Sequence, residues 1–463
     1  MRMRLVVSAF AALAASLAAS PATAQVVIPD HGVIGVGPEQ LRPEYWVQRQ
    51  PAPDREILTP TEIAEQNRRM LAVDPSLHDL DRLPAALTRA QVREWVERRS
   101  QVPTRQLFDE RGDSVTAAAI AALVDGVQLD AIPPEQPLRF ALVTRRADLR
   151  TFPTRLRVFS SRDNTDIDRW QESALFPGTP AVIVHESRDA GWWFVVSHHY
   201  AAWIEKSHVA EGPREAVLGY ARKEPYLVVT GAKVHTVFTP ERPQVSELQL
   251  EMGVRVPLLA GWPADSVVNG QHPYAGHVVE LPVRTEDGRL ELVPALLPPT
   301  ADVASGYLPL TAGGILRQAF KFLGERYGWG HGYNGRDCSG FVSEVYRSFG
   351  VDLPRNTGDQ ANTPALNRLA FTEADTHGRR LAVVGETQVG DLLYIPGHVM
   401  MVIGRVDGVT YVIHDTTGTN YLVDGALVRV PLNGVSVTQL ETLQASAERT
   451  TVETIRSIQR IRR

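Results

Sequence analysis

The stretch YGWGHGYNGRDCSGFVSEVYRSFG, from Tyr327 to Gly350, contains the only cysteine among the 463 residues of the chain. After Cys338, apolar residues recur at helical spacing and stop at Gly350, which indicates a buried helix that begins at the cysteine. A helix N-terminus presents unpaired N–H groups and positive partial charge, and both favour a thiolate. A lone cysteine is otherwise a small buried hydrophobe. Because a structural cysteine gains nothing from this position, we interpret Cys338 as a nucleophile with a lowered pKa.

Two histidines downstream are candidates for the base that such a nucleophile needs. His398 begins the β-rich segment HVMMVIGR, and His414 lies late in the next one, VTYVIHDT, after an Asp-Gly turn. A two-residue loop places the two imidazoles on opposite faces of the hairpin. A three-residue loop over 406–408 pairs Arg405 with Val409 and places them on one face. Because the chemistry requires the two imidazoles to meet, we predict the three-residue loop.

A zinc site is the main chemical alternative for these residues. Cys338, His398 and His414 offer three ligands, but the sequence lacks a close ligand pair such as CxxC or HExxH around them. We therefore expect neither a metal nor another cofactor. The other histidines, His198 and His199 among them, are interpreted as surface residues or as core residues with satisfied hydrogen bonds.

The first residues, MRMRLVVSAFAALAASLAASPATAQ, have the pattern of a secretory signal peptide. Arg2 and Arg4 precede an apolar run that is too short to span a membrane, and a small-x-small cleavage site ends at Ala24. We expect residues 1–24 to be removed, leaving a periplasmic or extracellular protein without a membrane span. Lipid attachment is not expected, because no cysteine follows the cleavage site.

The composition is that of an ordinary globular protein, with 43% hydrophobic and 22% charged residues. The length allows roughly three or four domains. The formal net charge is −5, and removing the leader makes the remainder more negative because the leader has two arginines and no acid. Bulk charge therefore gives no reason to expect nucleic acid or an anionic membrane as a partner.

The residue pattern changes several times along the chain after the leader. The segments LTPTEIAEQNRRML and LTRAQVREWVERR each have a threonine cap before a helical pattern, and TAAAIAALVDG reads as a short apolar helix. Short β-rich runs follow, and then a mixed region. We expect a helical region over 25–135, small β-barrels over 136–211 and 212–298, a mixed domain over 299–445, and a solvated terminal helix or tail over 446–463.

Four ordered motifs resemble the NlpC-type cell-wall peptidases, a family with a papain-like fold and a Cys-His-His triad. They are YGWGHGYNGRDCSGF, LPRNTGDQ, GDLLYIPGHVMMVIG and YVIHDTTG. The earlier segments EYWVQRQ, ILTPTEIAEQN and DIDRWQESALFPGTPAVIVHESRDAGWWFV resemble a subgroup with a helical clip and two bacterial SH3-like barrels. The resemblance implies a multidomain α+β protein with a papain-like catalytic domain at its C-terminal end.

The resemblance also implies roles for individual residues. Cys338 is expected to be the nucleophile, His398 the general base and His414 the group that orients it. Tyr327 is expected to stabilise the oxyanion together with the backbone N–H of Cys338. The residues expected to line the substrate groove are Asp337, Ser339, Asn356 and Thr357. His331 stands where a glycine is common, and we expect the loop to tolerate it.

The subgroup cleaves the amide between the γ-carboxyl of D-glutamate and the diamino acid of peptidoglycan stem peptides. Its first barrel recognises a free N-terminal L-alanine through an acid and a tyrosine. Here the tyrosine is Tyr200, whereas the acid position falls near Gln171, with Glu172 adjacent. The expected partners are stem peptides or muropeptides. The sequence does not choose between diaminopimelate and lysine as the diamino acid. It also leaves open whether the substrate is intact wall or released muropeptide, and whether its N-terminus has to be free.

Two other functions are compatible with the same sequence. One is that of a peptidoglycan-binding scaffold. The other is that of a papain-like amidase or acyltransferase that acts on another substrate. The presence of Cys338, His398 and His414 together disfavours a scaffold, because a binding protein gains nothing from an exposed thiolate. Turnover of a γ-D-glutamyl-diamino acid peptide would separate these possibilities.

Overall fold

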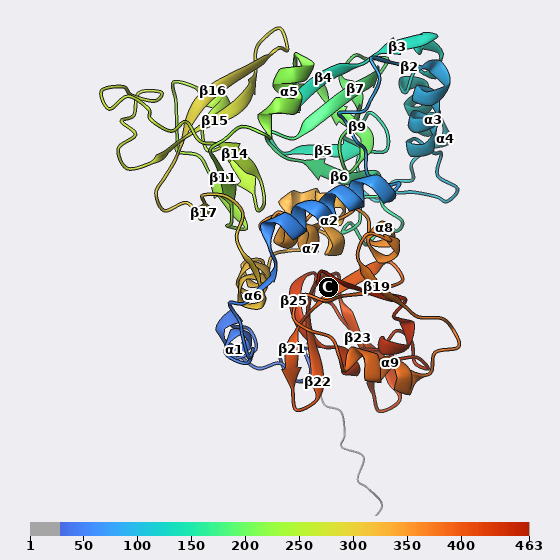
Figure 1. Ribbon diagram of the computed structural model, residues 1–463. Helices are drawn as coiled ribbons and strands as arrows, with labels where there is room; N and C mark the ends of the chain where they lie inside the picture. Colours follow the sequence, from blue (N-terminus) through green and yellow to red (C-terminus); the bar gives the residue numbers. More distant parts are fainter. Residues whose placement is uncertain (1–27, 463) are drawn as a thin grey trace, which may run out of the picture.

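The computed structural model describes residues 28–462, so the predicted leader lies outside the described part of the chain. Figure 1 shows two β-rich units in the upper half of the molecule and a third, mixed unit below them, with helix α2 (Pro60–Val73) crossing the middle of the view. The predicted multidomain α+β fold is confirmed. Among residues 28–462, no helix combines the length and the apolar character that a bilayer span requires.

The N-terminal region is helical, and its helices begin where the sequence predicts. Thr59 caps α2 and Thr88 caps α3, and each threonine forms a reciprocal capping box with the residue three positions later. Trp46 and Met70 are fully buried against the third unit, so this region packs across the rest of the protein. Helix α3 spans Arg89–Arg99. The other helices of the region are α1 (Pro43–Val47) and α4 (Ala117–Gly126). Short strands β1 (Glu56–Leu58), β2 (Ala86–Thr88) and β3 (Glu135–Pro137) flank them.

The first β-rich unit is a seven-stranded antiparallel sheet in the order β10-β4-β7-β8-β9-β5-β6. Trp203 and Phe194 are fully buried and meet edge to face, with ring centroids 5.5 Å apart. Such aromatic pairs add to the stabilisation that burial gives. The strands are β4 (Arg139–Val143), β5 (Ala147–Arg150), β6 (Gln171–Leu175), β7 (Pro180–Glu186), β8 (Trp192–Val196), β9 (Ala201–Glu205) and β10 (Val209–Gly212).

The second β-rich unit consists of several small antiparallel sheets around one apolar core. Its longest hairpin pairs β15 with β16 through a turn at residues 285–289. Helix α5 (Arg214–Tyr220) joins the two β-rich units. The strands are β11 (Tyr226–Val229), β12 (Lys233–His235), β13 (Gln249–Glu251), β14 (Arg255–Pro257), β15 (His277–Arg284), β16 (Leu290–Leu297) and β17 (Val303–Ala304).

The third unit packs helices α6 and α7 against a six-stranded antiparallel sheet in the order β19-β26-β20-β21-β22-β25. The helices are α6 (Ala312–Phe320), α7 (Cys338–Arg347), α8 (Thr357–Asn362) and α9 (His377–Val384). The strands are β18 (Leu310–Thr311), β19 (Asn367–Ala370), β20 (Leu392–Ile395), β21 (His398–Val406), β22 (Val409–Thr416), β23 (Thr419–Val423), β24 (Ala426–Val430) and β25 (Gly434–Gln439).

The prediction of a solvated terminal helix or tail over 446–463 is wrong. Strand β26 (Ser457–Arg460) lies inside the sheet between β19 and β20, where Ile458 is paired with Leu393 and fully buried. The adjacent Gln459 side chain donates from Nε2 to the backbone carbonyls of Gln360 and Thr363, which ties β26 to the end of α8. The arginines of the segment suggest a surface tail, but the alternation around Ile458 is that of a strand.

Candidate active site

Cys338 begins α7, as the sequence predicts. The carboxylate of Asp337 caps the helix by accepting the backbone N–H of Gly340 at 2.8 Å. Phe341 and Val345 are fully buried on the inner face of the helix, so packing fixes where the cysteine lies. The thiol is 6% exposed and lies 3.5 Å from Thr357 Oγ1.

The two histidines share a face of the β21–β22 hairpin, but the predicted turn is wrong. Val406 pairs with Val409 across a two-residue loop in which both residues have positive φ. A β-bulge between Val402 and Gly404 adds one residue to β21 and shifts the register beyond it. Met401 therefore pairs with Ile413, which puts His414 diagonally next to His398.

Contact with another element explains the bulge. Gly404 has a φ of +146°, and a Cβ at this position would lie 2.9 Å from Cε3 of Trp46. Trp46 belongs to α1 and is fully buried. The ring therefore packs directly on the backbone of the bulge, and a residue about 350 positions away along the chain supports the register that joins the histidines.

The imidazoles form a directed chain of hydrogen bonds. His398 Nε2 lies 2.7 Å from His414 Nδ1, and His414 Nε2 lies 3.1 Å from the hydroxyl of Thr438 on β25. When His398 keeps its proton on Nε2, it donates to His414, which in turn donates to Thr438. The Nδ1 lone pair of His398 is then free to accept a proton from a thiol. Sequence reasoning missed Thr438, because only the pairing of β25 with β22 brings it next to His414.

The predicted low pKa of Cys338 is wrong for the unliganded site. Burial and the negative charge of Asp337 raise the pKa of the thiol to about 12, and these effects outweigh a hydrogen bond to Thr357 and one to the backbone N–H of Val399. Burial lowers the pKa of His398 to about 4 and that of His414 well below its usual value. The resting pair is therefore a neutral thiol and a neutral imidazole.

Tyr327 lies in the loop before α7 and is almost completely buried. Burial raises the pKa of its phenol, and the neighbouring Cys338 and Asp337 charges raise it further. The phenol therefore stays protonated and can donate a hydrogen bond beside the thiol. This is the property that the predicted oxyanion role requires.

Asp337 and Ser339 belong to a buried network that sequence reasoning missed. Arg355 donates to Asp337 Oδ2 at 2.8 Å and to Ser339 Oγ at 3.0 Å. It also donates to Nδ1 of His331, whose Nε2 lies 3.0 Å from Glu344 on α7. Burial opposes ionisation of Asp337, but Arg355 overcomes it and lowers the pKa of the carboxyl to about 2.

His331 is therefore more than a tolerated replacement for glycine. Its φ is +64°, its ring is 4% exposed, and it bridges Arg355 to Glu344. Burial and the Arg355 charge lower the pKa of this imidazole to about 4, which agrees with a neutral ring that accepts from one partner and donates to the other. Asn356, by contrast, is exposed and immediately precedes α8, so it is available to a ligand.

The barrel residues form a second cluster near Asn356. Tyr200 donates to Glu172 Oε2 at 2.6 Å, which brings the two predicted residues together. Glu172 also accepts from Thr151 and from Arg99 of α3, each at 2.5 Å. The Arg99 guanidinium lies 4.4 Å from the centroid of the Tyr200 ring. Gln171 points elsewhere and donates to the carbonyl of Gly330.

The described residues resemble known proteins over two parts of the chain. Residues 324–429 match the NlpC/P60 family, and residues 157–205 match the SH3 domain of the SH3b1 type. Over 116 residues, 24% of this chain, the sequence is 34% identical to the probable endopeptidase p60 of Listeria seeligeri and of Listeria welshimeri. The match spans only 21% of the length of these relatives.

A solved NlpC/P60 endopeptidase from Photobacterium damselae subsp. piscicida has a similar fold. The TM-score is 0.70 at 16% identity, over 88% of this chain and 94% of that chain. The resemblance inferred from the four motifs is confirmed. The chain carries an NlpC/P60 domain, and an SH3 domain of the SH3b1 type precedes it.

Proposed function

We propose that the protein is a cysteine endopeptidase that hydrolyses peptidoglycan stem peptides. The observation that carries the proposal is the chain from His398 through His414 to Thr438, beside a helix N-terminal thiol that accepts from the backbone N–H of Val399, the residue after His398. This arrangement leaves His398 Nδ1 as the acceptor for the thiol proton and supplies an acceptor for the proton on Nε2. A triad of nucleophile, base and orienting group has this geometry.

The reaction follows from the protonation states. As substrate enters, the Cys338 proton moves to His398 Nδ1 and the sulfur attacks the scissile carbonyl carbon. His414 Nδ1 accepts from the resulting imidazolium and stabilises it. The oxyanion accepts from the Cys338 backbone N–H and from Tyr327. His398 then gives the proton to the departing amine. A water molecule next attacks the acyl carbon while His398 takes its proton, the carbon–sulfur bond breaks, and the proton returns to the Cys338 sulfur.

The bond we propose is the amide between the γ-carboxyl of D-glutamate and a diamino acid. The support is the position of Tyr200 and Glu172 in a cluster that shares a cavity of about 200 Å³ with Asn356. Both Tyr200 and Asn356 line that cavity, whereas Glu172 lies behind Tyr200 and is bonded to it. A group held in a fixed position beside this cavity would select substrates by the length between the amino end and the scissile bond.

Arg99 affects which kind of substrate N-terminus, free or blocked, can bind near Glu172. The Glu172 carboxylate already accepts from Arg99, Tyr200 and Thr151, so an incoming ammonium has to displace the guanidinium. A blocked amino end carries no charge that Arg99 repels. We therefore propose that the enzyme does not require a free N-terminal L-alanine and accepts stem peptides whose amino end is acylated.

Defined stem peptides test the proposed function. The tetrapeptides L-Ala-γ-D-Glu-X-D-Ala, with diaminopimelate or lysine as X, are incubated with the enzyme in free and N-acylated forms. Mass spectrometry should find cleavage only between D-Glu and X, and Cys338→Ala protein should give none. Cleavage at another bond, or none in any peptide, would refute the proposed specificity.

The exported location is part of the same proposal and rests on the leader pattern. The substrate lies outside the cytoplasm, which agrees with the predicted removal of residues 1–24. N-terminal sequencing of protein recovered from an exporting host should begin at Gln25. Recovery of intact chain from the cytoplasmic fraction alone would contradict this location.

A further inference from the structure

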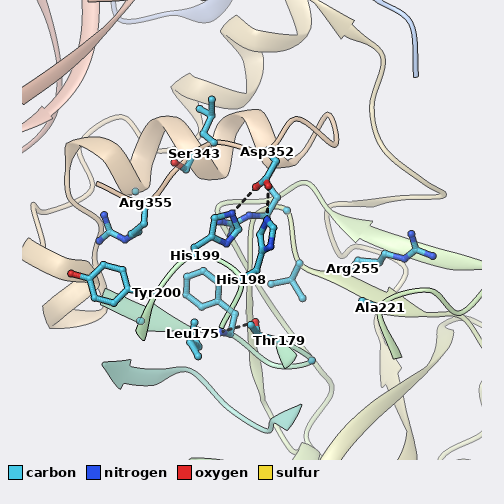
Figure 2. A pocket seen from close by; sticks show the side chains of 18 of the residues that line it. Leu175, Thr179, His198, His199, Tyr200, Ala221, Arg255, Ser343, Asp352 and Arg355 are labelled. Carbon is cyan, nitrogen blue, oxygen red and sulfur yellow. Dashed lines mark hydrogen bonds and ion pairs between the residues drawn. The ribbon is translucent and has the colours of Figure 1, made fainter. Parts of the chain in front are cut away.

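Two histidines and an aspartate from separate units meet at a cavity of about 390 Å³. His198 and His199 lie in the turn between β8 and β9, and Asp352 lies between α7 and α8. Figure 2 shows both imidazoles pointing at the Asp352 carboxylate, with Tyr200 and Arg355 to one side. His198 Nε2 is 2.7 Å from Asp352 Oδ2, and His199 Nε2 is 2.6 Å from Asp352 Oδ1.

These three side chains present a set of metal ligands. Their nearest ligand atoms all lie within 4.8 Å of one another, and within residues 28–462 no other group of three histidine, cysteine or acidic side chains does so. Imidazole nitrogen and carboxylate oxygen are ligands that Zn²⁺ prefers. All three residues are half-buried rather than exposed.

The second nitrogen of His198 gives an independent indication. His198 Nδ1 lies 3.1 Å from the backbone carbonyl of His78, which accepts hydrogen bonds only, so Nδ1 carries a proton. Nε2 faces the Asp352 carboxylate on the opposite side of the ring. Metal-binding histidines typically donate their other N–H to a carbonyl in this way.

The aspartate is also held from outside the cluster. The backbone N–H of Asp352 donates to Asn67 Oδ1 at 3.0 Å, and Asn67 Nδ2 donates to the carbonyl of Gly350 at 2.7 Å. Asn67 belongs to α2, so three units of the protein converge on the cluster. Such outer contacts orient ligands before a metal binds.

We propose that His198, His199 and Asp352 bind a divalent transition-metal ion such as Zn²⁺ between the SH3 domain and the catalytic domain. Each imidazole coordinates through Nε2 and keeps its proton on Nδ1, so any Nε2 proton leaves when the ion binds. The ion replaces the direct nitrogen–oxygen contacts, which widen to about 3.4 Å because tetrahedral ligands lie about 2.1 Å from zinc. The adjoining cavity leaves room for water as a fourth ligand.

The proposed ion holds two parts of the substrate groove at a fixed separation. Tyr200 directly follows His199, and Asn356 lies four residues after Asp352. A metal bridge between these segments fixes the barrel cluster relative to the catalytic domain. The role is structural and separate from the chemistry at Cys338, so it does not depend on the identity of the peptide substrate.

Calorimetric titration with ZnCl₂ tests the proposal. Cys338→Ala protein serves as the parent, because a thiol is itself a zinc ligand. One zinc should bind per chain, and in the same background Asp352→Asn and His199→Ala should each weaken binding more than tenfold. His235→Ala removes an exposed histidine of the second β-rich unit and should leave binding unchanged.

Two further readouts separate loss of ligands from loss of fold. Zinc should raise the melting temperature of the parent and of His235→Ala but not of Asp352→Asn, whose circular dichroism should match that of the parent. Crystals soaked in ZnCl₂ should give an anomalous peak among the three side chains. Absence of binding to the parent, a peak elsewhere, or full affinity in Asp352→Asn would overturn the proposal.

Discussion

His398 Nε2 lies 2.7 Å from His414 Nδ1 although the two-residue turn between their strands would by itself place the rings on opposite faces. The β-bulge before Gly404 supplies the missing residue of register, and the Trp46 ring packs against it. A contact from α1 thus supports the alignment of the two imidazoles. The consequence is testable at a position far from the chemistry.

Substitution of Gly404 by valine should reduce activity without touching a catalytic side chain. The new side chain collides with Trp46 and favours a regular strand, in which the two imidazoles no longer share a face. We expect kcat to fall at least about 100-fold, because misplaced catalytic groups have effects of this size. Gly378→Val, at a position of α9 with open space for a Cβ and no left-handed φ, is the matched control and should cost much less. Equal losses in the two variants would refute the role of the bulge.

Within the triad, the severity of single substitutions should follow the roles. Cys338→Ala and His398→Ala should each abolish detectable turnover, and the double variant should be no worse, since the groups act as a unit. His414→Ala should cost less because it removes orientation alone. Full activity in His414→Ala, measured as kcat on a stem peptide, would show that the histidine contact is incidental.

Thr438→Val should lower kcat by about fivefold while changing KM little. It removes the acceptor for the His414 proton, and one such hydrogen bond contributes about 1 kcal/mol. Thr410→Val, at a fully buried threonine of β22, is the control for packing changes in the same sheet. A loss of kcat shared equally by the two variants would mean that Thr438 contributes through packing only.

The pH dependence should reflect the buried, neutral pair. Because the pKa of His398 is lowered to about 4, the neutral base is present above that pH, and kcat/KM should fall only as the pH drops through about 4. Initial rates on a stem peptide between about pH 3 and pH 8 measure this limb. An acid limb near pH 6.5 would show that the imidazole is not desolvated.

Alkylation of the enzyme without substrate tests the raised pKa of the Cys338 thiol. With the pKa of Cys338 raised to about 12, the iodoacetamide rate should keep rising with pH beyond pH 9, whereas a free thiol levels off above about 8.5. N-acetylcysteine in the same assay provides the comparison. A plateau below pH 7 would contradict the raised pKa and show that Cys338 is a thiolate, as the helix N-terminus alone suggests.

Arg355→Met should destabilise the protein by about 3–5 kcal/mol, because it leaves Asp337 buried and unpaired. Arg368→Met removes an exposed arginine from the same domain and should change stability by less than about 0.5 kcal/mol. Urea unfolding at neutral pH measures both. The pKa of Asp337 is lowered to about 2 from 3.8, so its stabilising contribution is present above pH 3.8 and is lost as the pH falls through 2.

Arg99→Met should raise kcat/KM for free-amine peptides relative to N-acylated ones. The substitution frees the Glu172 carboxylate for an ammonium group. Tyr200→Phe should lower the same ratio, because the phenol lines the cavity and its hydrogen bond holds the Glu172 carboxylate in place beside it. The kinetic ratio for paired peptides is the measurement. An unchanged ratio in both variants would reduce the barrel cluster to a packing element.

The sequence by itself determined the features that depend on neighbouring residues. The helix that begins at Cys338 follows from its apolar period and from the capping of its first turn by Asp337. The caps at Thr59 and Thr88 are local as well. The proposed nucleophile, base and orienting histidine could be chosen from residue types and order, because a thiolate nucleophile needs a base and an orienting group.

Only the tertiary structure decided the features that depend on distant contacts. The bulge at Gly404 packs against Trp46, far away in the sequence. The arginine-rich C-terminal segment pairs with Leu393 in the sheet, and Arg99 of the N-terminal region binds Glu172 of the first β-rich unit. The pKa of Cys338 rises rather than falls because the folded protein removes water from the thiol, and in the buried site that desolvation outweighs the helix N-terminus. Local sequence specifies where a helix or turn begins, whereas register, burial and ionisation depend on what packs against it.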